Sequence, residues 1–207
     1  ILKGILSGAT GSGTHLNVAD IAKELGVSPS PVRDALLRLA AEGLVTNNDN
    51  RRATVVRFTP KDVEDIFQVR EILEGAAAEL AAPRIDQAGL EELKQAAEEC
   101  AAALSDHPEG RLNFLELDNR FHLLIADTGG NSVLREEIVR TSRRVRVMQW
   151  LRLSKQRMTT AYPEHLEVLA ALEKGDAAAA RAAMVNHIRH SLKYVLEGVL
   201  AAEAAHR

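Results

Sequence analysis

Residues 28–45 read SPSPVRDALLRLAAEGLV, and this stretch decides the fold of the first part of the chain. Ser30 followed by Pro31 is typical of a helix N-cap with proline at the first helical position. Apolar residues then recur at helical spacing, at Val32, Ala35, Leu36 and Leu39. Gly43 is expected to end the helix. The stretch therefore predicts one amphipathic helix that begins at Ser30.

The flanking residues extend this helix into a small fold. Residues 18–27, VADIAKELGV, have helical spacing that Gly26 stops. Two short runs with strand character, LVTNN (44–48) and ATVVRF (53–58), surround the polar turn DNRR. Helix, tight turn, helix and hairpin, in this order, predict a winged helix-turn-helix.

From residue 60 onward the pattern is helical throughout. Breaks are expected at residues 83–86, 105–110, 128–131 and 175–176, and around Thr159 and Thr160. They separate six helices of roughly 14 to 29 residues, with no strand after Phe58. We therefore expect a mainly α protein, with a winged helix-turn-helix DNA-binding domain at 1–58 followed by an antiparallel all-α bundle that binds a ligand at 59–207.

Composition narrows the function classes. The 207 residues carry a net charge of −3, but residues 1–58 hold seven Lys/Arg against five Asp/Glu and the remainder nineteen against twenty-four. No apolar run approaches the roughly 20 residues of a membrane span, and no signal peptide is visible, so we expect a cytoplasmic protein. The single cysteine, Cys100, excludes an internal disulfide and a cysteine-rich zinc site. Seven aromatic residues argue against a stacking platform for single-stranded nucleic acid.

The second helix of a helix-turn-helix lies in the major groove with its N-terminal residues facing the DNA. Arg33 lies off the apolar stripe and is expected to contact guanine or phosphate, and Ser28 and Ser30 to contact phosphate. Arg51 and Arg52, in the hairpin turn, are expected at the backbone or the minor groove. The alternative is a capped surface helix on which Arg33 pairs with a neighbouring acid.

Residues 5–45, ILSGATGSGTHLNVADIAKELGVSPSPVRDALLRLAAEGLV, resemble the DNA-binding domain of GntR-family bacterial transcription regulators. PVRDAL and EGLV are the most specific segments. Pro29 stands where the family usually has arginine, and Arg52 where its wing usually has glycine. The resemblance implies a homodimer that binds a double-stranded DNA operator, and it implies repression relieved by an effector as the commoner mode.

Residues 60–207 resemble the FCD-type ligand-binding domain of the FadR subfamily. The resemblance rests on DVEDIFQVREILEGAAAELAA (62–82), DNRFH (118–122), GGNSVL (129–134), EHLEVLAAL (164–172) and MVNHIRHSL (184–192). The motifs are individually loose, but their order behind a GntR-like segment is specific. The resemblance implies a helical domain that binds an effector.

Four polar residues lie on apolar helix faces in this half. Asp118 and His122 are one turn apart in LELDNRFHLLIAD (115–127), flanked by Phe114, Phe121 and Ile125. His165 and His187 each share a stripe with apolar residues of later helices. Any one of them alone is more simply a core residue hydrogen-bonded to a carbonyl or water.

Together, three imidazoles and one carboxylate suit a borderline divalent ion such as Zn²⁺, Ni²⁺ or Mn²⁺. The resemblance implies the same site, because the metal-binding subset of the FCD class has Asp and His four apart and two later histidines. The remaining histidines are expected elsewhere: His15 and His107 in turns, His190 off the stripe, His206 at the terminus.

An ion with four protein ligands has room for a small carboxylate or hydroxy-acid effector. Arg70 projects from an apolar helix face and is a candidate effector contact, although a pair with Glu74, one turn on, is equally open. Ser142 and Arg146 follow Ile138 at one-turn spacing and are further candidates. The arginines of residues 140–146 as a group suit a solvated or subunit-facing surface.

These features favour a DNA-binding transcription regulator whose operator affinity is controlled by a metabolite bound beside the metal. One alternative is a regulator in which the ion itself is the signal. A metallohydrolase is disfavoured because His122 is followed by Leu123, not by the glutamate of an H-E-x-x-H motif. A protein-interaction module leaves PVRDAL and the inward histidines unexplained.

Overall fold

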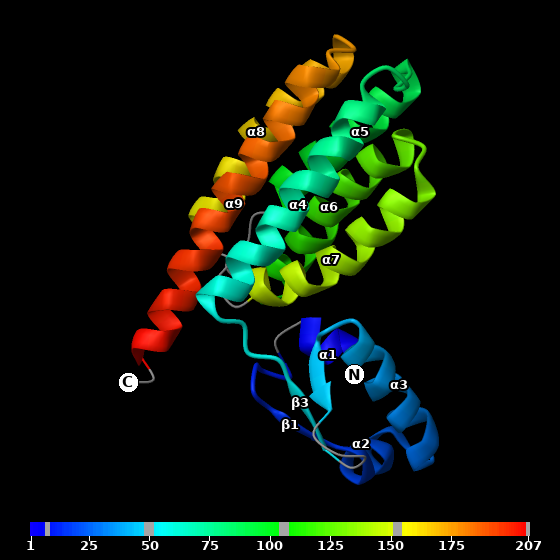
Figure 1. Cartoon of the computed structure of the whole chain (residues 1–207), viewed down its shortest axis with the longest axis vertical. Coiled ribbons are helices and arrows are strands. Elements are labelled where there is room, and N and C mark those ends of the chain that lie inside the picture. The colour runs from blue at the N-terminus through cyan, green and yellow to red at the C-terminus, as the bar shows by residue number, and fades with distance from the viewer. Residues whose placement is uncertain (7–8, 48–51, 104–107, 151–154, 206–207) are drawn as a thin grey trace. The chain divides into compact units, whose positions relative to one another are not determined.

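The computed structural model describes residues 1–6, 9–47, 52–103, 108–150 and 155–205 (Figure 1). The chain divides into two compact units, Ile1–Phe58 and Thr59–Arg207. The predicted mainly α fold is confirmed: the first unit joins short helices to a small sheet, and the described part of the second unit is helical.

The first unit is a winged helix-turn-helix. Its elements in chain order are α1 (Leu2–Leu6), β1 (His15–Asn17), α2 (Val18–Leu25), α3 (Pro29–Ala41), β2 (Val45–Asn47) and β3 (Arg52–Val55). The antiparallel sheet has the order β1-β3-β2, with Leu16 opposite Ala53 and Val45 opposite Val55. Val32, Leu36 and Leu39 of α3 are buried, as their spacing predicts.

The predicted start of α3 at Ser30 was wrong. Ser28 is the N-cap and Pro29 opens the helix. Both Pro29 and Pro31 fit in the first turn because the N–H groups there have no partner within the helix. At the other end, Gly43 follows the last turn with a φ of 71°, which an L side chain rarely adopts.

Two elements of this unit were not predicted, because α1 and β1 are too short to show periodicity. The prediction that His15 lies in a turn was wrong as well. His15 is in β1, opposite Thr54, and its Nδ1 lies 3.0 Å from the Thr54 hydroxyl.

The second unit contains the six predicted helices in its described part: α4 (Pro60–Ala81), α5 (Gln87–Ala102), α6 (Pro108–Thr128), α7 (Ser132–Trp150), α8 (Lys155–Glu173) and α9 (Ala177–Ala205). α4 and α9 lie side by side, and α4 begins at the end of the bundle where α9 finishes (Figure 1). α6 packs against α4, α5 and α7, while α8 packs against α5 and α9. This is the antiparallel bundle that the pattern predicts.

Short polar residues set the helix boundaries. Thr59 and Asp62 form a capping box at the start of α4, and the Asp86 side chain accepts from the Gly89 N–H at the start of α5. Before α9, the Asp176 side chain likewise accepts a hydrogen bond from the Ala179 N–H. Three of the predicted breaks, at 83–86, 128–131 and 175–176, therefore separate helices, whereas α6 already begins inside the predicted break at 105–110.

The predicted break around Thr159 and Thr160 was wrong, because α8 runs through both residues. Adjacent β-branched residues lower helix propensity only slightly. The Thr160 hydroxyl also donates to the Arg157 carbonyl at 3.0 Å, so its polar group is satisfied inside the helix.

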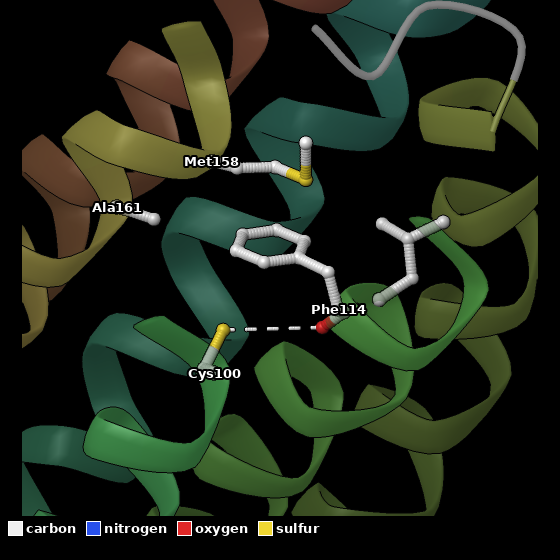
Figure 2. Packing of buried hydrophobic residues seen from close by; sticks show 5 residues of the cluster. Cys100, Phe114, Met158 and Ala161 are labelled. Atoms are coloured by element: carbon white, nitrogen blue, oxygen red, sulfur yellow. Dashed lines mark hydrogen bonds between the residues drawn. The ribbon is translucent and has the colours of Figure 1, made fainter. Parts of the chain in front are cut away.

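A buried apolar cluster joins three helices of the bundle (Figure 2). Cys100 of α5, Phe114 and Leu115 of α6, and Met158 and Ala161 of α8 form it. The Cys100 thiol donates to the Phe114 carbonyl at 3.9 Å, and burial raises the pKa of that thiol, which keeps it protonated and inert. Because Phe114 lies one turn before Asp118, this cluster fixes the helix that carries the first two candidate metal ligands.

Within the residues that the structure describes, no helix combines the length and the apolar character needed to cross a membrane.

Candidate metal centre

Four buried side chains from three helices meet inside the second unit. Asp118 and His122 come from α6, His165 from α8 and His187 from α9. One ligand atom from each residue can be chosen so that all four lie within 4.8 Å of one another. The residues on either side of them along each helix face, Phe114, Ile125, Val168 and Met184, are buried core. The helical spacing thus directs all four polar groups into the bundle.

The contacts among the four are short. His187 Nε2 lies 3.1 Å from His122 Nε2. Asp118 Oδ1 lies 3.3 Å from His165 Nε2, and Asp118 Oδ2 lies 3.8 Å from His122 Nε2. The Phe121 ring stacks on His165 with centroids 4.2 Å apart, which holds that imidazole from its apolar side.

The outer nitrogens of two of these histidines face carboxylates. His122 Nδ1 lies 2.5 Å from Glu74 Oε2, and His187 Nδ1 lies 2.8 Å from Glu164 Oε2. Arg157 Nη2 also approaches His187 Nδ1, but only to 3.5 Å, so the carboxylate contact decides that Nδ1 carries the proton.

Each carboxylate is held in turn by an arginine. Arg70 Nε donates to Glu74 Oε1 at 2.7 Å, and both side chains are buried. Arg157 Nη1 donates to Glu164 Oε2 at 2.8 Å. Two chains of the form arginine, glutamate, histidine therefore end at the same point, one from α4 to α6 and the other from α8 to α9.

Counting protons tests whether these residues fit a cation. Each glutamate faces the Nδ1 atom of its histidine, so a proton placed on each Nδ1 leaves the Nε2 atom of that ring without one. The Nε2 atoms of His122 and His187 then face each other across 3.1 Å with lone pairs only. Such an arrangement is unfavourable unless a metal ion accepts both lone pairs or a proton lies between the two nitrogens. The residues present thus fit a metal ion.

The neighbouring histidine gives a second, independent sign. Among the described residues, His165 Nδ1 has no hydrogen-bond partner and Nε2 has only the 3.3 Å contact with Asp118 Oδ1, although the residue is 0% exposed. A buried polar atom without a partner costs free energy, and natural proteins rarely retain one without a reason. Coordination of one nitrogen supplies that reason.

The electrostatics keep the ligands in their metal-binding forms. Burial lowers the pKa of His165 and, more strongly, that of His187, so both imidazoles are neutral with a free lone pair. Burial alone raises the pKa of Asp118, but the contacts with His165 and His122 outweigh it and the pKa lies below its usual value. Burial likewise opposes ionisation of Glu74, yet Arg70 and His122 hold its pKa at about 2.

Two cavities adjoin the centre, and both are lined by Asp118 and Gln149. The Arg70 cavity, with about 10 Å³ of interior space, is further lined by Arg70, Asn119, His122, Ser142 and Arg146. The Arg157 cavity, also with about 10 Å³ of interior space, is further lined by Phe114, Arg157, Ser191 and Tyr194. Each cavity has room for about one water, so a small polar ligand enters this polar lining only if the surrounding side chains move.

The structure brings the three candidate effector residues together around the Arg70 cavity. The pair of Arg70 with Glu74 is present through Nε, while Arg70 Nη1 is buried and has no hydrogen-bond partner among the described residues. The Ser142 hydroxyl donates to the Ile138 carbonyl, and Arg146 Nη2 to Glu116 at 3.3 Å.

The other histidines lie apart from the cluster, as far as the structure describes them. His190 is exposed, with Nδ1 3.1 Å from Glu164 Oε1, and His15 belongs to the first unit. His107 and His206 are outside the described residues.

Sequence reasoning missed Glu164 and Arg157, and treated Glu74 only as a partner of Arg70. One available signal was the position of Glu164 directly before His165, in EHLEVLAAL.

The candidate DNA-contacting residues lie in the first unit. Ser28, Ser30 and Arg33 are exposed at the N-terminal end of α3. Arg52 opens β3, where its backbone pairs with Asn17, and Arg51 is outside the described residues. The serines and Arg33 thus share the end of α3 that a helix-turn-helix presents to the major groove.

Comparison with known proteins agrees with both halves of the chain. Residues 1–56 match the model of bacterial regulatory proteins of the gntR family, and residues 65–190 match the FCD domain. The chain is 29% identical over 199 residues to the uncharacterized HTH-type transcriptional regulator YdhC of Bacillus subtilis, covering 94% of this chain and 88% of that protein.

Similar agreement extends to a second relative and a solved structure. The HTH-type transcriptional repressor RspR of Escherichia coli is 30% identical over 180 residues, which is 86% of this chain and 77% of that protein. The structure of E. coli McbR/YncC has a TM-score of 0.81 at 22% identity, covering 95% of this chain and 93% of that one. The chain therefore belongs to the GntR family of bacterial regulatory proteins, as a transcriptional regulator with a helix-turn-helix DNA-binding domain and an FCD domain, and it is not an enzyme.

Proposed function

We propose that this regulator is a homodimeric repressor whose FCD domain holds a divalent transition metal ion, and that a small carboxylate or hydroxy-acid bound beside the ion controls its affinity for the operator. Asp118, His122, His165 and His187 hold the ion, which is Zn²⁺, Ni²⁺ or Mn²⁺. When bound, the ion supplies an open coordination position for an oxygen of the effector.

The observation that carries the metal assignment is the convergence of four buried ligand atoms within 4.8 Å. A single buried histidine is satisfied by a carbonyl or a water, but here the Nε2 atoms of His122 and His187 lie 3.1 Å apart and Nδ1 of His165 has no partner among the described residues. The alternative of ordinary core histidines leaves these atoms unexplained.

The effector class follows from the Arg70 cavity. Arg70 Nη1 is a buried donor without a hydrogen-bond partner among the described residues, and it adjoins the same cavity as Asp118 and His122. A carboxylate can accept from this donor with one oxygen while a second oxygen faces the ion. Ser142 and Arg146 supply further polar groups around it.

The DNA-reading assignment rests on exposure and position. Arg33 is exposed near the start of α3, where it contacts base edges or phosphate, with Ser28 and Ser30 on phosphate. We propose that Arg51, which is outside the described residues, and Arg52 contact the DNA backbone or the minor groove from the wing. Repression as the mode of action is supported by the relative RspR, which is named a repressor.

The test is the metal content of protein purified without added metal or an affinity tag, compared with a His122→Ala, His165→Ala double variant. We expect about one transition-metal ion per chain in the wild type and its loss in the variant. A wild type that carries no ion, and takes none up at micromolar concentration, contradicts the metal assignment and leaves only the DNA-binding function.

The same protein distinguishes an effector-controlled regulator from a metal sensor. The four ligands are buried, which favours an ion that is retained over one that exchanges freely. We therefore expect the ion to survive dialysis against a mild chelator, and operator affinity to respond to carboxylates and not to the free concentration of metal.

A further inference from the structure

Two glutamates beside the candidate metal centre, each paired with an arginine, have no role in the proposed function. Glu74 and Glu164 touch none of the cavities that the structure describes at the site, and neither belongs to the four-residue ligand set. They are nevertheless the residues that the outer nitrogens of His122 and His187 face, at 2.5 and 2.8 Å.

An imidazole has two nitrogens, and the group that faces one of them determines what the other can do. A carboxylate beside Nδ1 accepts a proton from it and leaves Nε2 as a lone pair. The same contact fixes the rotation of the ring about its bond to Cβ. In metal sites, an outer hydrogen bond of this kind raises ligand basicity, and its loss commonly weakens metal binding by about 10-fold to 100-fold.

We infer that Glu74 and Glu164 are positioning residues that hold His122 and His187 in the Nδ1–H tautomer, so that both Nε2 lone pairs point at one ion. The inference rests on the proposed metal site. It assigns a role to two carboxylates from different helices, α4 and α8, that bind no metal themselves.

The arginines explain why the carboxylates keep their places. Arg70 and Arg157 each donate to the glutamate that faces a histidine, at 2.7 and 2.8 Å, and both arginines are buried. A hydrogen bond from a buried guanidinium keeps a glutamate side chain from rotating away to solvent. Glu164 is held at a second point as well, because its Oε1 lies 3.1 Å from His190 Nδ1.

Glu164 offers the cleaner test, since its side chain is 12% exposed and it lies on α8, where alanine favours the helix. Glu164→Ala removes the acceptor, whereas Glu164→Gln retains an acceptor oxygen without the charge. Glu167, three residues further along the same helix and exposed, provides the matched control Glu167→Ala.

The measurement is the affinity of each purified full-length variant for Zn²⁺, obtained by competition with a chelator of known affinity. The visible spectrum of the Co²⁺-loaded protein reports ligand geometry in the same samples. We expect Glu164→Ala to bind Zn²⁺ about 10-fold to 100-fold more weakly with an altered Co²⁺ spectrum, Glu164→Gln to lose clearly less, and Glu167→Ala to match the wild type.

The outcomes distinguish a failure of the metal site from a failure of the positioning role of Glu164. A wild type that binds neither ion contradicts the metal site itself. A wild type that binds Zn²⁺ while Glu164→Ala binds it equally well overturns the positioning role alone, and so does an equal loss in Glu164→Ala and Glu164→Gln, which indicates an effect of charge only. If Glu164→Ala does not fold, Glu164→Met, which fills the space without an acceptor, replaces it.

Discussion

The buried ion pair between Arg70 and Glu74 gives the sharpest stability prediction. Their side chains are 5% and 4% exposed, and Arg70 Nε donates to Glu74 Oε1 at 2.7 Å. Replacing Glu74 by glutamine keeps the shape but leaves a guanidinium buried without its counter-charge. Removal of one partner from a buried pair costs about 3 to 5 kcal/mol.

The pKa of Glu74 gives a separate figure for the same pair. Its ordinary value is 4.5 and its value in the fold is about 2, so folding favours the ionised form. A difference of this size corresponds to about 3 kcal/mol, which agrees with the cost of breaking a buried pair. We therefore expect Glu74→Gln to lower the free energy of unfolding by about 3 kcal/mol at pH 7.

The assay is urea denaturation of protein freed of metal with a chelator, so that metal binding does not enter the comparison. Asp65→Asn is the control, because Lys61 and Asp65 form a pair of the same i, i+4 spacing on α4 whose side chains are 72% and 54% exposed. Its loss should change the urea midpoint little. The double variant Arg70→Met, Glu74→Gln should recover most of the loss, since it leaves no unpaired charge and keeps an acceptor oxygen for His122 Nδ1.

A Glu74→Gln variant whose free energy of unfolding lies within about 1 kcal/mol of the wild-type value contradicts this prediction, because removing one charge of a buried, ionised pair costs more than that. A double variant that is less stable than Glu74→Gln also refutes it, since the guanidinium is then not the source of the cost.

Three further predictions concern the pH dependence of stability, the recognition helix and Gly75. Because the folded pKa of Glu74 is depressed, its stabilisation is complete above pH 4.5 and is lost as the pH falls towards 2, so the urea midpoint of the wild type should fall over that range and that of Glu74→Gln should fall less. Arg33→Ala should weaken binding to an operator selected from random DNA by about 1 to 3 kcal/mol in fluorescence anisotropy, whereas Arg38→Ala, exposed in the last turn of α3, should change it little. Gly75→Leu should destabilise the helical unit by about 1 to 3 kcal/mol in thermal unfolding, because even a Cβ at Gly75 approaches Val185 to 3.0 Å.

Helical periodicity predicted most of the second unit, because each helix has one apolar face and most helix boundaries, although not that between α7 and α8, coincide with a predicted breaker. The predicted break at Thr159 and Thr160 was wrong because it rested only on the low helix propensity of threonine, and α8 continues through both residues. It also failed at α1 and β1, whose few residues show no period. In the winged unit, Pro29 and Pro31 indicated that a helix begins nearby, but they did not distinguish an N-cap at Ser28 from one at Ser30.

The candidate ligands could be predicted because burial of a helix face can be read from one helix at a time. Asp118 and His122 stand out as polar residues on such a face, and so do His165 and His187. The outer carboxylates could not be predicted in this way. Glu164 lies beside the stripe of α8 and meets His187 only because α9 packs against α8, and that pairing depends on how two helices approach. Position on one helix does not contain this information.

The charges around the metal centre predict that the ion and a carboxylate effector bind cooperatively. The carboxylates of Asp118, Glu74 and Glu164 and the guanidinium groups of Arg70 and Arg157 leave one net negative charge among largely buried groups. A divalent ion changes this to one net positive charge, which a monocarboxylate neutralises. Uncompensated buried charge is costly, so the ion and a carboxylate should each strengthen the binding of the other.

This linkage can be measured with acetate or glycolate as the probe. Either anion should raise the melting temperature of the Zn²⁺-loaded protein and have little effect on the chelator-treated protein, because without the ion it adds negative charge to a site that already has an excess. An equal rise in both forms would show that Arg70 alone attracts the anion. In that case the ion lies beside the effector cavity but does not bind the effector. Because coupling between two binding sites is reciprocal, an anion whose affinity does not depend on the metal cannot change the affinity of the protein for the metal.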